Sequence, residues 1–154
     1  MAKKWYLVGP MTSCYYKGGI WRNSAKRMLE CIDPYEQESN VRPPLPHKNL
    51  FEFYNSLRAA HHLDRLRKAF RTILGINDKS VRAAFGLLCY EPYPQEVSSW
   101  GTIREVSLAF DLGKPIVIWS GVPLERMNFT AIAMSSAIVP TLTEAVAVCK
   151  SLEG

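Results

Sequence analysis

The stretch GTIREVSLAFDLGKPIVIW, residues 101–119, contains most of what decides the fold. Its first twelve residues carry apolar side chains at the spacing of one helix face: Ile103, Val106, Leu108, Ala109 and Leu112. Gly113 tolerates the left-handed backbone that ends a helix, and Pro115 cannot continue one. The apolar run 115–119 is typical of a buried strand. The stretch therefore predicts a helix followed by a strand of a parallel sheet.

The rest of the chain continues this alternation of helices and strands. The expected strands are residues 4–8, 85–90, 115–119 and 137–139, with a short one near Cys31. The expected helices are residues 20–32, 50–73, 78–84 and 101–112, and a closing helix opened by a capping box of Thr141 and Glu144. The proline-rich residues 33–49 are expected to form a long surface loop. The pattern predicts an α/β fold: a flavodoxin- or Rossmann-like three-layer sandwich with a mostly parallel sheet of about five strands.

Length and composition are those of one globular domain spanning residues 1–154. The chain is 47% hydrophobic and 21% charged. No apolar run approaches the roughly 18 to 20 residues of a membrane span. The first residues lack the long apolar stretch of a secretory signal. We therefore expect a cytoplasmic protein with no membrane partner.

A net charge of +5 suits an anionic partner. The densest basic run, within residues 58–71, has helical spacing, which a solvated helix face explains better than a nucleic-acid groove. We therefore expect a small phosphate-bearing molecule and no polymeric nucleic acid. The four cysteines are scattered, without a C-x-x-C pair, and the adjacent His61 and His62 point in different directions on a helix. Neither pattern predicts a metal site.

The expected ligand site lies beyond the carboxyl ends of the strands, near the point where strand order reverses. Gly101 follows one of the loops that should gather there. Glycine permits close backbone approach, and the free N–H groups of a helix start attract an anion. Glu105 lies one turn inside this helix and should face the crevice. Its position alone also fits a carboxylate that complements the helix dipole or pairs with Arg104 or Lys114.

Two motifs resemble the nucleoside 2-deoxyribosyltransferase superfamily. Residues 6–11, YLVGPM, match the end of its first strand. Residues 101–105, GTIRE, match its Gly-Thr/Ser-x-x-Glu helix start, and the helix again ends in Gly-Lys-Pro before a strand. The second motif is the more specific one. The resemblance implies an N-glycosidase or glycosyl transferase that acts on a nucleoside or nucleotide without a metal or organic cofactor.

The glutamate of the second motif is the nucleophile in that family, which implies this role for Glu105. A carboxylate suits the reaction because cleavage passes through an oxocarbenium-like state, which it can trap as a glycosyl-enzyme. The resemblance implies that Tyr6 lies beside Glu105 and positions it. It also implies substrate contacts from the two motifs, at Gly9, Met11, Gly101 and Thr102.

Ser99 bears on the choice between nucleoside and nucleotide. Relatives that act on free nucleosides usually keep an aspartate at or next to this position. The related 2′-deoxynucleoside 5′-phosphate N-hydrolases have a serine there, which binds the 5′-phosphate that an aspartate would repel. Cationic and polar groups near the first loop favour phosphate as well: Ser13, Lys17 and Arg22. A 5′-monophosphate hydrolase is therefore the first hypothesis, and a base-exchanging transferase is the second.

Asn77 departs from the family pattern, which has an aspartate there that meets the base or assists its departure. A neutral asparagine can hold a base but cannot protonate one. Three explanations stay open: Asp78 takes the role through a small shift, the base specificity differs, or turnover is lost. The last would leave a non-catalytic nucleotide sensor.

The resemblance also implies a homodimer or higher oligomer, because members usually borrow active-site residues from a neighbouring copy. Asn128 and residues 127–136 are the expected contribution.

Overall fold

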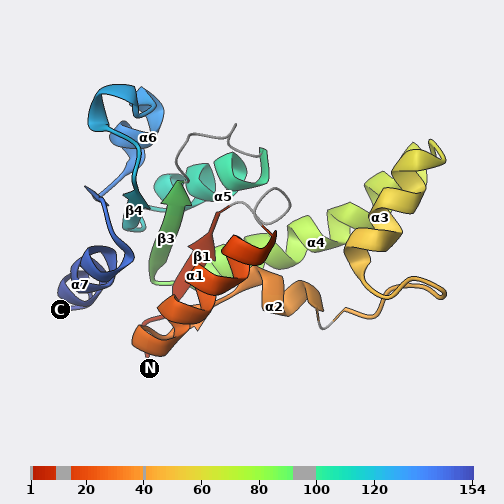
Figure 1. The fold of residues 1–154 in the computed structure, drawn as a ribbon, viewed down its shortest axis with the longest axis horizontal. Helices are drawn as coiled ribbons and strands as arrows, with labels where there is room; N and C mark the ends of the chain where they lie inside the picture. The colour runs from red at the N-terminus through yellow and green to blue at the C-terminus, as the bar shows by residue number, and fades with distance from the viewer. Residues whose placement is uncertain (1, 10–14, 40, 92–99) are drawn as a thin grey trace.

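The computed structural model describes residues 2–9, 15–39, 41–91 and 100–154. Five strands form one parallel sheet in the order β2-β1-β3-β4-β5 (Figure 1). They are β1 (Trp5–Val8), β2 (Cys31–Ile32), β3 (Gly86–Glu91), β4 (Ile116–Ser120) and β5 (Ala137–Val139). This is the flavodoxin-like order, which reverses between β1 and β3. The predicted α/β fold is confirmed.

Helices cover both faces of this sheet. Helices α1 (Tyr15–Met28) and α7 (Leu142–Leu152) lie on one face, and α4 (Leu63–Ala83) and α5 (Trp100–Asp111) on the other. The shorter elements are α2 (Pro34–Ser39), α3 (Leu50–Ala59), η1 (Leu124–Arg126) and α6 (Phe129–Met134). Within the described ranges, no helix combines the length and apolar character that a bilayer crossing requires.

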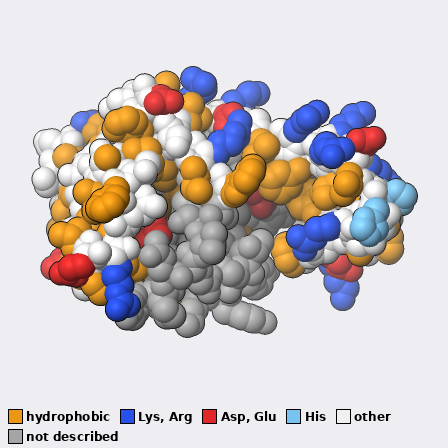
Figure 2. Space-filling view, turned by 90° about the horizontal axis from the view of Figure 1, so that it is seen from above, with side chains coloured by type: hydrophobic (Ala, Val, Ile, Leu, Met, Phe, Trp, Pro, Cys, Tyr) orange, Lys and Arg blue, Asp and Glu red, His pale blue; other side chains and the backbone are white. Residues whose placement is uncertain are grey.

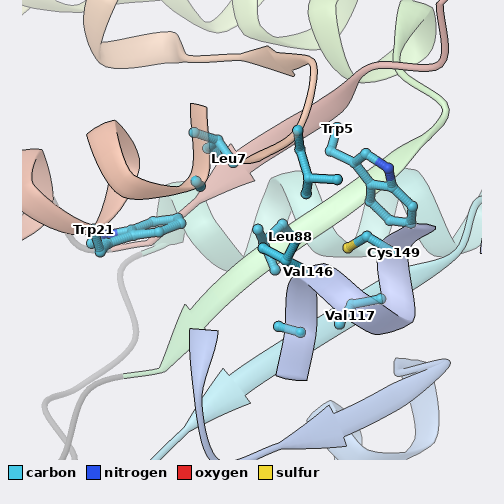
Figure 3. Close-up of a cluster of buried hydrophobic side chains, with 10 residues drawn as sticks. Trp5, Leu7, Trp21, Leu88, Val117, Val146 and Cys149 are labelled. Atoms are coloured by element: carbon cyan, nitrogen blue, oxygen red, sulfur yellow. The ribbon is translucent and has the colours of Figure 1, made fainter. Parts of the chain in front are cut away.

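Two buried clusters of side chains hold the layers together. Successive residues of a strand point to opposite faces, so Trp5 and Leu7 pack toward α1 and α7 (Figure 3). Tyr6 and Val8 pack toward α4 and α5, in the second cluster. The pleat of β1 therefore directs Tyr6 toward the helix that carries Glu105.

The predicted helix over residues 50–73 is wrong as a single element. Helix α3 ends at Ala59, and His61 has a positive φ of 57°. The N–H groups of His61 and His62 bond back to the carbonyls of Arg58 and Leu57, as in a Schellman motif. Helix α4 then starts at Leu63 and runs on to Ala83, so it absorbs the separate turn that was expected at residues 78–84.

Two further boundaries differ from the sequence prediction. The helix expected over residues 20–32 begins earlier, at Tyr15, and ends at Met28, since Cys31 and Ile32 form β2. Part of the expected loop 33–49 is helix α2. Asp33 caps it, because its carboxylate accepts the Tyr35 N–H at 3.0 Å.

Helix α3 and the N-terminal half of α4 form an arm that projects from the sheet (Figure 1). Its basic side chains are exposed, as predicted for a solvated face: Arg58, Arg65, Arg67, Lys68 and Arg71. Figure 2 shows Lys and Arg side chains spread over this part of the surface. An apolar cavity of about 510 Å³ lies between the two helices, lined by Phe51, Tyr54, Leu66, Phe70 and Leu74 among others.

Gly86 begins β3 at a position with no room for a side chain. A Cβ there would lie 2.6 Å from Cζ3 of Trp5 and 2.7 Å from the carbonyl oxygen of Pro115. Because a backbone oxygen cannot rotate away, Gly86→Ala should lower the free energy of unfolding by about 1–3 kcal/mol, measured by urea denaturation. Gly75→Ala is the matched control, since its Cβ meets nothing within 4 Å. Because Gly75 lies inside α4, Gly75→Ala should raise the free energy of unfolding by about 0.5–1 kcal/mol. Equal stability of the two variants would contradict the close contact.

Candidate active site

The carboxylate of Glu105 receives hydrogen bonds from two other elements. Tyr6 Oη, on β1, donates to Glu105 Oε1 at 3.1 Å. Asn77 Nδ2, on α4, donates to the same oxygen at 3.4 Å. Tyr6 is fully buried and Asn77 is 6% exposed. Side chains from β1, α4 and α5 therefore converge at the Glu105 carboxylate, between β1 and the two helices.

Burial makes the carboxyl group of Glu105 a weaker acid than that of an exposed glutamate. Removal from water raises its pKa to about 7, while the Tyr6 hydrogen bond and the positive charge of Arg22 act in the opposite direction. Burial and the charge of Glu105 raise the pKa of Tyr6, so Tyr6 keeps its proton and acts as a donor. A carboxylate that titrates near neutral pH is suited to nucleophilic or acid–base chemistry.

Arg22 lies in the interior, 1% exposed. Its Nη1 donates to the Leu7 carbonyl at 2.9 Å and to the Asp33 carboxylate at 3.3 Å. Its Nη2 donates to the Gly9 carbonyl at 3.1 Å. This placement gives no support to Arg22 as a phosphate ligand near the first loop. Arg22 is a structural cation that joins α1 to the ends of β1 and β2.

Asp78 points away from its neighbour Asn77 and pairs with Arg104. The Arg104 Nη2 donates to the Asp78 carboxylate at 2.7 Å, between α4 and α5. Adjacent residues of a helix face different directions. The structure therefore gives no support to Asp78 as the replacement for a family aspartate at position 77.

Glu38, on α2, belongs to the same cluster and was missed by the sequence analysis. It is half-buried and lies near Asn77. Burial raises the pKa of Glu38, while the positive charge of Arg22 and the polar side chain of Asn77 act in the opposite direction. The negative charge of Glu38 in turn raises the pKa of Glu105. The sequence offered little signal, because residues 33–49 had the composition of a loop and no motif includes Glu38.

The other predicted substrate contacts are placed as follows. Gly9 ends β1, and its carbonyl is bound by Arg22. Gly101 and Thr102 lie in the first turn of α5. Asn128 is exposed and caps α6, where its Oδ1 accepts the N–H of Thr130 at 2.8 Å. The remaining predicted substrate contacts lie outside the residues whose side chains are described: Met11, Ser13, Lys17 and Ser99.

In the described part of the chain, no three His, Cys, Asp or Glu side chains are grouped as ligands for a metal ion.

Comparison with known proteins gives matches at the level of structure. No protein-family model and no curated protein matches the sequence. A 2-deoxyribosyltransferase from Leishmania mexicana matches with a TM-score of 0.62 and 15% identity, covering 95% of either chain. A 2-deoxyribosyltransferase from Bacillus psychrosaccharolyticus has a TM-score of 0.59 and 15% identity, over 93% of this chain and 90% of the other. A CMP N-glycosidase from Clostridium botulinum has a TM-score of 0.51 and 12% identity, over 97% and 99%.

Because the sequence identities are low, these matches show a similarity of fold alone. The fold agrees with the resemblance that the two sequence motifs show to the nucleoside 2-deoxyribosyltransferase superfamily.

The raised pKa of Glu105 predicts a dependence of stability on pH. The unfolded glutamate loses its proton near its ordinary pKa of 4.5, and the folded one near 7. Stability should therefore fall as pH rises between these values, and the loss persists above pH 7. Glu105→Gln removes the charge and should raise the free energy of unfolding at pH 8 by about 1–3 kcal/mol more than at pH 4.

Urea unfolding at the two pH values measures this difference. Glu30→Gln is the control, because Glu30 is exposed and precedes β2, at the amino ends of the parallel strands. A gain from Glu105→Gln that is the same at both pH values would show that the folded protein does not bury this charge.

Proposed function

We propose that the chain is an N-glycosidase that cleaves the base–sugar bond of a nucleoside 5′-monophosphate, ribo or deoxy, through a Glu105 glycosyl-enzyme. The observation that carries this proposal is the buried Glu105 carboxylate held by the Tyr6 hydroxyl at 3.1 Å. It lies beside the point where the strand order reverses, which is where open α/β sheets bind ligands.

The chemistry follows from this geometry. The C1′ of a bound sugar develops positive charge as the base departs, and a buried carboxylate stabilises that charge more strongly than an exposed one. Tyr6 and Asn77 both donate to Oε1 of Glu105, and Oε2 is the oxygen that would attack C1′. Water then hydrolyses the glycosyl-enzyme. The reaction class matches the named activities of the structural neighbours, two 2-deoxyribosyltransferases and a CMP N-glycosidase.

The phosphate on the substrate is proposed from sequence and charge. Ser99 stands where the nucleotide hydrolases of the superfamily use a serine, and the net charge of +5 favours an anionic substrate. The exposed Gly101 and the first turn of α5 supply N–H groups close to Glu105.

Base exchange is the second candidate activity, because two of the neighbours are transferases by name. The same glycosyl-enzyme would serve both reactions, with a second base in place of water. A sensor that binds a nucleotide without turnover is the non-enzymatic alternative, for which Asn77 is the supporting feature.

Incubation with nucleosides and their 5′-monophosphates, ribo and deoxy, tests the proposal, with chromatography to detect free base. We expect base release from a monophosphate, and a rate in Glu105→Gln that is lower by roughly a thousandfold or more. Glu30→Gln should keep the wild-type rate. The value of kcat/KM should rise with pH through about 7, because Glu105 must lose its proton.

Each other result points to a different function. Exchange seen after a second base is added would identify the transferase. Binding without any base release, unchanged in Glu105→Gln, would identify the sensor and remove the enzyme.

We also propose that the protein is a homo-oligomer, with the surface near α5 and α6 as the contact. Large apolar side chains are exposed there: Trp100 is 90% exposed and Phe129 is 89% exposed. Asn128 lies next to Phe129. Light scattering should give at least twice the chain mass of 17.4 kDa, and Phe129→Ser should shift the protein toward monomer. A wild-type monomer at all concentrations would remove this proposal.

A further inference from the structure

Two polar contacts join α4 and α5 through neighbouring residues of each helix. Asn77 Nδ2 donates to Glu105 Oε1 at 3.4 Å. In the adjacent positions, Arg104 Nη2 donates to Asp78 Oδ2 at 2.7 Å. Asn77 is 6% exposed, whereas the side chains of Asp78 and Arg104 are 27% and 44% exposed. The bond to Glu105 is therefore the inner contact, and a short ion pair lies beside it, nearer the surface.

The ion pair is the shorter and stronger of the two contacts. A hydrogen bond of 3.4 Å is near the limit at which such bonds form, so a small displacement of either helix breaks it. A bond of 2.7 Å between a guanidinium and a carboxylate has the length of a strong charge-assisted contact. Because each member of the ion pair is the chain neighbour of a member of the inner contact, the ion pair sets how closely Asn77 approaches Glu105.

Apolar packing alone does not fix this part of the helix pair. Val81 of α4 and Val106 and Ala109 of α5 belong to one buried cluster, and each of them follows the polar contacts in its own helix. The attraction between apolar surfaces has no preferred direction, so it holds the helices together but permits a small sliding or rotation. A directional contact at residues 78 and 104 removes that freedom at the position of Glu105.

Asp78 depends on Arg104 more than a fully exposed carboxylate would. Its Oδ1 atom is buried and has no hydrogen-bond partner among the described residues. Exposed ion pairs contribute little to stability, but a partly buried carboxylate that loses its cation is left uncompensated. We therefore expect the pair to stay closed in the folded protein.

We propose that Arg104 and Asp78 are positioning residues for Glu105. Their ion pair keeps α4 and α5 in the arrangement in which Asn77 and Tyr6 both donate to Oε1 of Glu105, so that Oε2 keeps one orientation toward C1′. The inference rests on the N-glycosidase activity proposed above. It adds no group to the reaction itself, since neither residue of the pair needs to contact the substrate.

Arg104 acts on the acidity of Glu105 as well. Its positive charge lowers the pKa of Glu105. The other charged or titratable groups facing Glu105 come from four elements: Tyr6 on β1, Arg22 on α1, Glu38 on α2 and Cys89 on β3. Two substitutions separate the effects of Arg104. Asp78→Asn breaks the ion pair and leaves the charge of Arg104 in place, whereas Arg104→Gln removes both.

The first measurement is turnover of the monophosphate that the wild type cleaves, at about pH 9, where Glu105 is ionised. In Asp78→Asn we expect kcat to fall by roughly 10- to 100-fold, since a displacement of about 1 Å at the reacting group has an effect of this size. KM should change by less than about twofold, because no substrate contact is removed. Arg104→Gln should lose the same activity and should also shift the midpoint of the pH profile above the wild-type value.

A charge swap tests whether the ion pair itself is needed. Asp78→Arg combined with Arg104→Asp restores a pair of opposite charges and should recover kcat at about pH 9. The midpoint of its pH profile should rise further, because a carboxylate then precedes Glu105. Asp64→Asn is the matched control: it breaks another ion pair of 2.7 Å, with Arg67, on the arm. The control should leave kcat and the pH profile unchanged.

Urea unfolding gives a readout without turnover. If the ion pair acts through the inner contact, Asp78→Asn should lower the unfolding midpoint less in an Asn77→Ala background than in the wild type. Asp64→Asn should lower the midpoint equally in both backgrounds, since it lies on the arm.

Three results would overturn the proposal. The first is wild-type kcat in folded Asp78→Asn. The second is a charge swap that recovers no activity, and the third is additive shifts of the unfolding midpoint, since either would show that the pair supports only its own surroundings. Absence of base release from the wild type would instead remove the N-glycosidase activity, and the unfolding cycle would still decide whether the ion pair holds Asn77 against Glu105.

Discussion

The buried guanidinium of Arg22 is the interaction on which the site depends. It binds the carbonyls of Leu7 and Gly9 at the end of β1, and the Asp33 carboxylate that caps α2. A buried cation deprived of such partners is strongly destabilising, so these contacts hold α1, β1 and α2 in one arrangement. The same positive charge lowers the pKa of both Glu38 and Glu105. A residue that fixes the positions of the elements therefore also sets the acidity of the groups between them.

Burial of Glu105 raises the pKa of its carboxyl group and at the same time lowers the stability of the fold. Removing a carboxylate from water raises its energy, which lowers stability but makes it a more reactive nucleophile and a group that titrates near neutral pH. The partners limit this effect without cancelling it: Tyr6 and Asn77 donate to one oxygen, and burial still raises the pKa of Glu105 to about 7. Stability is thus lowered at one point, while the two large apolar clusters on either face of the sheet maintain the fold.

Sequence patterns predicted the sheet well, because buried parallel strands are continuous apolar runs between helices. Residues 137–139, for example, form β5 with the predicted bounds. Sequence patterns failed where the conformation of a single residue or a tertiary contact determines the structure. Nothing in a periodic pattern shows that His61 adopts a positive φ, nor that Arg22 is buried. Tyr6 and Glu105 were found because each lies in a motif. Glu38 was not, because it is distant in the chain from Asn77 and Glu105 and comes near them only once α2 packs on α4.

Helix α4 has a different environment at each of its ends. Its N-terminal half packs on α3 in the arm, around Phe53, Leu57 and Ile73, and the arm contributes no residue to the two buried clusters of the described sheet. Its C-terminal half carries Asn77 and packs on the sheet through Val81. Substitutions in regions that share no contacts act nearly independently. Selection can therefore remodel the arm without disturbing the packing of the sheet, so one continuous helix joins a region free to diversify to one constrained by the geometry around Glu105.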